Sequence, residues 1–317
     1  MNNKELIEIK NDKRNRNIQQ DQTINDEHIF KNFEKNEEIT DRKEWMHHLG
    51  LFMLFLICGF LAVGPIQWSN IKLPTIINII YKISIPLIFL ALTIFLYRHE
   101  RLNKYWQAFY AFFVGSVVFF IAWLFFFFFS FQTTTIEGIA YTKLLEATLI
   151  VIPIIVLIKI SSGDMDSILL KKGNLKLGLL VGLVGFIGFL MLSISVAEIL
   201  FYGTNLTWER VISWMPWILI FVFANGLLEE ILYRGLFLKR YESSLGFNAS
   251  NILTAMIYSL IHFGVVYTSE NLVFLVMTFF LGLLYGFMIR KTDSLLSSIL
   301  FHAGTDILII IGVFSTL

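Results

Sequence analysis

The sequence predicts an all-α fold, a polytopic bundle of about nine transmembrane helices. Apolar residues occupy 56% of the 317 positions, and phenylalanine alone supplies 32 of them. The mean hydropathy of +0.69 is well above that of an ordinary soluble domain. The net charge of +1 comes without a long basic stripe, so the composition gives no electrostatic case for nucleic-acid binding. The single cysteine, Cys58, excludes an intrachain disulfide and a thiolate metal cluster.

The first 44 residues differ in composition from the rest of the chain. They are rich in Asn, Lys, Asp, Glu and Gln, with charges of both signs interspersed. This composition predicts a polar cytosolic tail that is partly disordered and has no chemistry of its own. Residues 45–200 are then assigned to the N-terminal transmembrane helices, and residues 201–317 to the C-terminal core that carries the candidate site.

Nine apolar stretches follow the tail, each close to the roughly 20 residues that a helix needs to cross the hydrocarbon core. The second stretch, with Lys82 and Pro86, and the short fourth one, with Pro153, are the weakest. No internal repeat is evident, so the pattern does not indicate an inverted-repeat transporter. The predicted spans are 49–67, 78–97, 107–131, 144–160, 177–200, 214–238, 251–268, 272–290 and 295–315.

Lys and Arg collect in alternate connections between these spans, which predicts the topology. The other connections are poor in them, with Lys72, Lys143 and Arg210 as exceptions. By the positive-inside rule the N-terminus is cytosolic and the C-terminus lies outside. The basic connections are the tail, Arg98–Lys104, Lys159–Lys176, Lys239–Arg240 and Arg290–Lys291.

Ionisable residues inside a span are costly and are therefore functional candidates. The last third of the chain concentrates them, and at about 1.5 Å per residue they lie roughly 10 to 18 Å from the predicted cytosolic ends. We therefore expect one shared site in the cytosolic half of the membrane. Each of three spans contains an i,i+4 pair on one helix face. The candidate residues are Glu229, Glu230 and Arg234 in the sixth span, Tyr258 and His262 in the seventh, and His302 and Asp306 in the ninth.

The adjacent glutamates of the sixth span are expected to have different roles. Glu230 lies on the same helix face as Arg234, so we expect these two to form an ion pair. Glu229 points about 100° away and remains available for chemistry. A buried carboxyl group of this kind suits a general base or acid.

The ordered set of polar groups resembles the CPBP (CAAX protease and bacteriocin-processing) or Abi family, which includes the type II CAAX prenyl endopeptidases. The resemblance covers about residues 214–310 and implies that Glu229 and His262 activate the hydrolytic water. It also implies that His302 and residue 306 stabilise the oxyanion, with the glutamate–arginine pair as structural support. The motifs are Glu-Glu-x-x-x-Arg at 229–234, Tyr-x-x-x-His at 258–262 and His-x-x-x-Asp at 302–306.

Two positions depart from the pattern of that family. Tyr258 stands where Phe is usual, which keeps an aromatic ring and adds a hydroxyl of unknown use. Asp306 stands where many members have Asn, and an ionised Asp is a poor oxyanion donor because like charges repel. Asp306 must therefore be protonated, orient His302, or bind a cation.

A metal site is the alternative to a glutamate mechanism. Zn²⁺ accepts nitrogen and oxygen ligands of the kind present here, and a three-ligand site with an open water position would hydrolyse peptides. Against zinc, the His-Glu-x-x-His motif is absent, and Glu229 as a ligand would leave no obvious general base. We prefer a mechanism that requires no cofactor and leave zinc open. The possible ligands are Glu229, His262, His302 and Asp306.

The sequence thus predicts an intramembrane peptidase that cleaves a small or membrane-associated peptide, with the lipid bilayer as its other partner. The Asn, Lys and Ile bias is typical of an AT-rich bacterial genome, which indicates a bacterial cytoplasmic membrane and argues against prenylated substrates. The resemblance then implies leader or bacteriocin-like peptides, self-immunity, or maturation of a peptide signal. A non-catalytic membrane regulator that binds a sensor kinase is the alternative, although no motif position has decayed to an apolar residue. A proton-coupled transporter would need polar groups through the full depth of the membrane.

Overall fold

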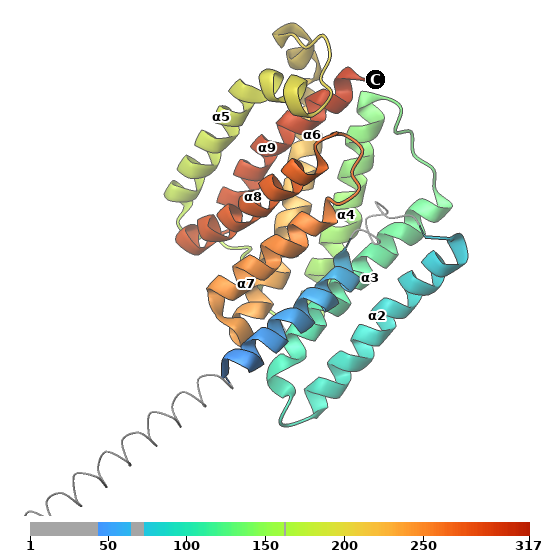
Figure 1. Ribbon diagram of the computed structural model, residues 1–317, viewed down its shortest axis with the longest axis vertical. Coiled ribbons are helices and arrows are strands. Elements are labelled where there is room, and N and C mark those ends of the chain that lie inside the picture. The colour runs from blue at the N-terminus through green and yellow to red at the C-terminus, as the bar shows by residue number, and fades with distance from the viewer. Residues whose placement is uncertain (1–43, 65–72, 162) are drawn as a thin grey trace, which may run out of the picture. The chain divides into compact units, whose positions relative to one another are not determined.

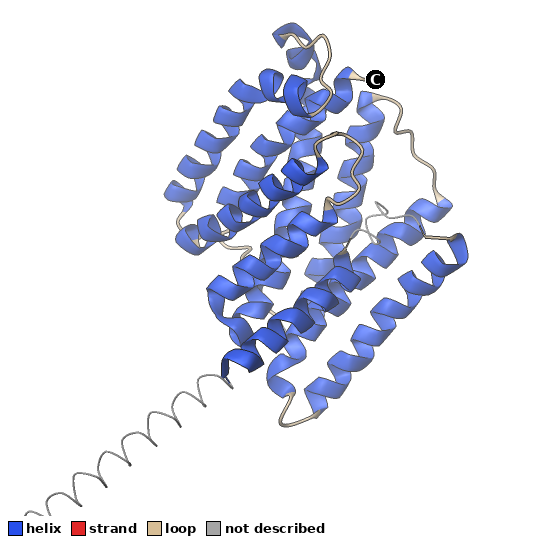
Figure 2. Ribbon diagram, viewed as in Figure 1, coloured by secondary structure: helices blue, strands red, loops and turns tan. Residues whose placement is uncertain are grey.

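The computed structural model describes residues 44–64, 73–161 and 163–317, and in these ranges the chain is helical with no strand (Figure 2). This confirms the all-α fold class. The predicted tail lies outside the described residues, apart from Glu44. Residues 52–317 form one compact unit that contains all candidate site residues. Besides the helix Glu44–Val63, the long helices are α2 (Thr75–Arg98), α3 (Trp106–Phe128), α4 (Ile136–Ile160), α5 (Leu175–Leu200), α6 (Trp208–Glu230), the π-helix η3 (Ile231–Leu238), α7 (Lys239–Ile261), α8 (Asn271–Thr292) and α9 (Leu296–Ser315).

Seven helical runs in the described part of the chain are long and apolar enough to cross a membrane. The number is smaller than nine for two reasons. The sixth and seventh predicted spans belong to one continuous run, Trp208–Ile261, and α4 is not among the seven. The nine predicted stretches therefore correspond to nine helical segments.

Helix starts follow capping side chains and not the beginnings of the apolar runs. The hydroxyl of Thr135 accepts a hydrogen bond from the amide of Gly138 (3.1 Å), and that of Thr207 from the amide of Arg210 (3.3 Å). Such N-caps satisfy backbone donors that have no partner within the helix. Consequently α4 begins at residue 136 and α6 at residue 208, before the predicted 144 and 214. Lys143 therefore lies inside a helix.

The seventh predicted span ends earlier than expected. Within α7, Gly246 has φ 70° and ψ 165°, which interrupts the helix and separates its first turns from the segment that carries the site. The helix then ends at Ile261 and not at residue 268. Gly264 has φ 81°, in the left-handed region that glycine adopts most readily. The apolar residues Phe263 and Val266 belong to the exposed turn that follows.

Helix α9 is central to the packing around the site: α5 lies along it and α6 packs against it, while α7 packs against α8 and η3 (Figure 1). Two glycines allow the helices to approach closely here. A Cβ at Gly304 would lie 2.7 Å from the Cα of Phe186 on α5, and a Cβ at Gly226 would lie 3.2 Å from the carbonyl oxygen of Ile299. Small residues at such contacts are typical of membrane helix packing.

Basic connections of the predicted topology meet at one end of the bundle. Arg240 donates to the side chains of Gln107 (3.2 Å), at the start of α3, and Ser167 (3.4 Å), between α4 and α5. Lys171 pairs with Asp293, just after α8, at 2.5 Å. The hydrogen bond from Lys171 to Asp293 raises the pKa of that lysine. The four basic connections of the described chain therefore share one end, as the alternation requires.

The connection between α5 and α6 meets the C-terminal end of α9 at the opposite end of the bundle. The amide of Thr204, between α5 and α6, donates to the hydroxyl of Ser315 at the end of α9 (3.0 Å). Both were predicted on the outer side. The side of the membrane that each end faces stays a prediction. Lys82, which weakened the prediction of the second span, is buried in α2 with its ammonium 6.0 Å from the ring centre of Trp123.

Candidate active site

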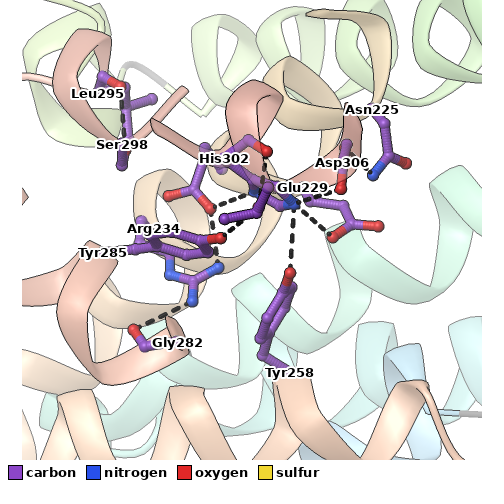
Figure 3. Close-up of polar contacts among 12 residues, drawn as sticks. Asn225, Glu229, Arg234, Tyr258, Gly282, Tyr285, Leu295, Ser298, His302 and Asp306 are labelled. Carbon is purple, nitrogen blue, oxygen red and sulfur yellow. Dashed lines mark hydrogen bonds and ion pairs between the residues drawn. The ribbon is translucent and has the colours of Figure 1, made fainter. Parts of the chain in front are cut away.

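The three predicted polar groups converge around His302 of α9 (Figure 3). Its Nδ1 lies 2.9 Å from Oε1 of Glu230, and its Nε2 lies 3.2 Å from the hydroxyl of Tyr258. The same Nε2 is 3.5 Å from Oε2 of Glu229 and 3.6 Å from Oδ1 of Asp306. His302 is 1% exposed. The depth argument from the sequence thus identified residues that do lie together.

Glu230 holds two partners with one oxygen. Its Oε1 lies 3.0 Å from Nη1 of Arg234, and both side chains are fully buried. The ion pair expected from the i,i+4 spacing is therefore present, although Arg234 lies in the π-helix η3. Because an ionised carboxylate accepts but cannot donate, the Nδ1–H of His302 donates a hydrogen bond to Oε1 of Glu230. The spacing within one helix could not reveal this second contact.

Arg234 is surrounded by further partners that fix its position. Its Nη2 donates to the carbonyl oxygen of Gly282 (3.1 Å). The guanidinium carbon lies 4.5 Å from the ring centre of Tyr258 and 5.0 Å from that of Tyr285. A π-helical turn is common at functional sites, where it redirects side chains. Here the turn belongs to the segment that carries the charge partner of Glu230.

Glu229 is buried but is left without a hydrogen bond at one oxygen. It is 4% exposed, and its Oε2 has no hydrogen-bond partner. The Nε2 of His302 lies 3.5 Å from this oxygen. A buried carboxylate oxygen normally has a donor. An oxygen of this kind is available to a water molecule or a substrate.

His262 lies at the C-terminal end of α7, where its Nδ1 is 2.8 Å from the carbonyl oxygen of Tyr258. A carbonyl oxygen only accepts, so Nδ1 is the protonated nitrogen and Nε2 keeps its lone pair in the neutral ring. His262 lines both of the cavities described below. Its Nε2 is therefore able to accept a hydrogen bond from water.

Asp306 is held by Asn225, which was not among the predicted site residues. The amide Nδ2 of Asn225 donates to Oδ2 of Asp306 at 2.9 Å. Asn225 lies four residues before Glu229 on α6, so the same helical spacing that selected the other pairs could have indicated it. The bond satisfies one carboxylate oxygen and leaves the other facing His302.

Two cavities meet at the site and share His262, Asp306 and Ile309. The more polar one, of about 370 Å³, is lined by Glu229 and Asn225 and also by Lys143 and Glu146 of α4. Lys143 and Glu146 form an ion pair at 2.7 Å. Lys143 was expected in a connection, because the apolar run begins after it. The capping residue Thr135 was the signal that could have corrected this.

The second cavity, of about 360 Å³, is mainly apolar. Its polar lining residues are Tyr258, His262, Thr278, Thr305 and Asp306. The ring of Phe280 on α8 is 63% exposed, so the cavity reaches the surface that faces lipid. Its other walls come from α5, α8 and α9 and include Phe189, Phe201, Phe274, Leu281, Leu284 and Leu308.

The candidate ligands do not fit a zinc site as they are arranged here. Among the described residues, no group of three or more His, Cys, Asp or Glu side chains is placed to hold a metal ion. A catalytic zinc ion needs three protein ligands at about 2.0–2.2 Å in tetrahedral geometry. The described residues, as they are arranged, therefore do not form such a site.

Apolar helices and a buried cluster of carboxylates and histidines define the class of protein: an integral membrane protein with a candidate hydrolytic site. Residues 211–308 match a protein family described as type II CAAX prenyl endopeptidase Rce1-like. The matched range extends from α6 into α9 and contains all seven predicted site residues. The match confirms the resemblance noted from the motifs and supports a CAAX-type intramembrane peptidase in general. No curated protein and no solved structure matches the chain.

Proposed function

We propose that this chain is an intramembrane peptidase that uses a glutamate to activate water and needs no metal ion. One observation carries the proposal: the buried Oε2 of Glu229 has no hydrogen-bond partner, and Glu229 lines a cavity together with His262 and Asp306. A general base must be within reach of the proton that it removes. Water in this cavity would meet that requirement.

In the proposed reaction a water molecule lies between Glu229 and His262. Glu229 takes a proton from the water while the water oxygen bonds to the carbonyl carbon of the peptide. The electrons of the C=O double bond move to the carbonyl oxygen. When the C–N bond breaks, the protonated Glu229 returns that proton to the leaving amine. His302, held by Glu230, and Asp306, held by Asn225, orient the site beside the developing oxyanion.

The apolar cavity suggests the class of substrate. A volume of about 360 Å³ accommodates a large apolar side chain, and its lipid-facing wall at Phe280 lets such a group enter from the bilayer. The polar cavity would then hold the backbone of the peptide beside Glu229. Small hydrophobic peptides, such as leader or bacteriocin-like peptides, combine these features. Maturation of such peptides or self-immunity is the proposed biological role.

A comparison of carboxylate variants tests the proposal. Purified protein in lipid would be incubated with a library of apolar peptides, and the products identified by mass spectrometry. Glu229→Gln keeps the shape of the side chain but loses proton acceptance, so the rate is expected to fall by about 10²–10⁴ while the protein stays folded. Glu198→Gln, an exposed glutamate on α5, is the matched control.

Two results would contradict the assignment in different ways. Cleavage by Glu229→Gln at the wild-type rate would remove Glu229 from the role of base. A folded wild-type protein that cleaves no peptide would favour the non-catalytic regulator, whose expected partner is a membrane protein such as a sensor kinase. Capture of that partner by wild-type protein and by Glu229→Gln alike would then support the regulator.

A further inference from the structure

The hydroxyl of Tyr258 lies where the histidine cluster meets the apolar cavity. It is 3.2 Å from Nε2 of His302, and the residue lines the cavity together with His262 and Asp306. The backbone carbonyl of Tyr258 also accepts the hydrogen bond from His262. The residue therefore contacts both histidines, one through its side chain and one through its backbone.

The ring of Tyr258 is held rigidly. It is 3% exposed, with the guanidinium of Arg234 at 4.5 Å from its centre and the ring of Tyr233 at 5.5 Å in edge contact. A rigid ring fixes the position of the hydroxyl oxygen in advance, so only the O–H bond has to turn when negative charge develops nearby. The nearby cation also favours negative charge close to the ring.

The other polar groups of this cavity have their protons engaged elsewhere. Thr305 donates to the carbonyl oxygen of His302 at 2.7 Å, and Thr278 donates to that of Phe274 at 3.0 Å. Asp306, when ionised, accepts and cannot donate. Among the described hydroxyl groups that line the apolar cavity, that of Tyr258 is the one that bonds to the side chain of a candidate site residue, His302.

From this geometry, and resting on the peptidase function proposed above, we infer that Tyr258 is a catalytic residue whose hydroxyl donates a hydrogen bond to the oxyanion. In the resting site the hydroxyl is engaged with His302. When Glu229 has taken the proton from water and the carbonyl electrons have moved to oxygen, the hydroxyl turns to that oxygen and keeps its own proton. The bond is released when the C–N bond breaks and the carbonyl re-forms.

Replacement by phenylalanine removes the donor and keeps the ring. Loss of one oxyanion donor typically costs about 10²–10³ in kcat, so Tyr258→Phe is expected to lose that much with little change in KM. Tyr285→Phe is the matched control, because Tyr285 is buried and also contacts Arg234 and His302 by its ring. Its hydroxyl meets Thr305 at 2.9 Å, and it lines neither cavity. We expect it to keep kcat within a few-fold.

A second measurement separates a catalytic from a structural hydroxyl. Fluorinated tyrosines at position 258 keep the oxygen but lose their proton at lower pH, so the alkaline limb of the kcat profile should move to lower pH. A structural hydroxyl would leave that limb in place. The same series keeps the inference testable if Tyr258→Phe fails to fold. A peptide phosphonate, which mimics the tetrahedral intermediate, should bind more weakly to Tyr258→Phe, while substrate affinity is retained.

The outcomes distinguish this inference from the proposed function. If the wild type cleaves peptides and Tyr258→Phe matches it in kcat, or the fluorinated series shows no shift, the function stands and the donor role is refuted. Tyr267, which lines the polar cavity, is the rival donor, and a loss confined to Tyr267→Phe would also refute the assignment. A folded wild type that cleaves nothing would overturn both proposals.

Discussion

Replacement of Glu230 by glutamine should show how strongly the buried ion pair stabilises this bundle. The change keeps the size of the side chain and leaves the charge of Arg234 without its carboxylate. Removal of one partner of a buried pair typically costs about 3–5 kcal/mol. Both side chains are 0% exposed, so solvent screening does not reduce this figure. Arg234 keeps the carbonyl oxygen of Gly282 and the faces of two tyrosines, so we expect a loss of about 3 kcal/mol, near the lower limit.

The double variant Glu230→Gln with Arg234→Met isolates the charge effect. It removes both charges, and methionine fills most of the apolar volume of the arginine stem. Much of the lost stability should return. The amide oxygen of the glutamine introduced at position 230 can still accept a hydrogen bond from Nδ1–H of His302, so the orientation of the His302 ring is retained. No change at Arg234 should restore the activity of Glu229→Gln, because that defect concerns proton transfer.

A double-mutant cycle would measure the free energy of unfolding of the wild type, Glu230→Gln, Arg234→Met and the double variant. All four would be measured in one lipid or detergent at a single reference condition. A coupling free energy of about 2 kcal/mol or more between positions 230 and 234 is expected. If the costs of the two single variants simply add in the double variant, the pair does not stabilise the fold. If Glu230→Gln is fully stable yet inactive while Glu229→Gln cleaves normally, the two carboxylates have been assigned the wrong way round.

Two further predictions concern topology and the metal. Single cysteines would be introduced at Lys172 and in the N-terminal tail, in a Cys58→Ser background. Both should be labelled only after the membrane is made permeable, because their basic segments are predicted to be cytosolic. Labelling of both in intact cells would reverse the predicted topology. Chelators should leave peptidase activity unchanged and purified active protein should lack stoichiometric zinc, whereas loss of activity that zinc restores would reverse our preference for a metal-independent mechanism.

Spacing within single helices predicted which polar residues lie close together. The i,i+4 pairs and the common depth correctly brought Glu229, His262 and His302 into one cluster, because both arguments depend only on helix geometry. Contacts between helices were beyond this reasoning. The bond from His302 to Glu230 and that from Asn225 to Asp306 depend on how α6 and α9 are rotated against each other, and the separate motifs do not specify that rotation.

The errors in the fold have a similar cause. An apolar run shows where lipid or core can be contacted, but a helix starts and ends where the backbone permits. Thr135 caps α4, which begins eight residues before the apolar run and so brings Lys143 into the polar cavity. Gly264 adopts a positive φ and keeps the apolar residues around it in a turn. The hydropathy pattern therefore assigned the start of α4 to a connection and the turn after Ile261 to a transmembrane span.

The lipid-facing wall of the apolar cavity has a consequence for biochemistry on this protein. With Phe280 largely exposed at its opening, the cavity is accessible to any flexible alkyl chain in the surrounding phase. A detergent tail can therefore compete with the substrate, so the apparent KM in micelles will depend on detergent concentration and chain length. Bilayer nanodiscs replace that competitor with lipids anchored by their headgroups. Kinetic constants for different peptides are therefore comparable only when they are measured in one amphiphile at one concentration.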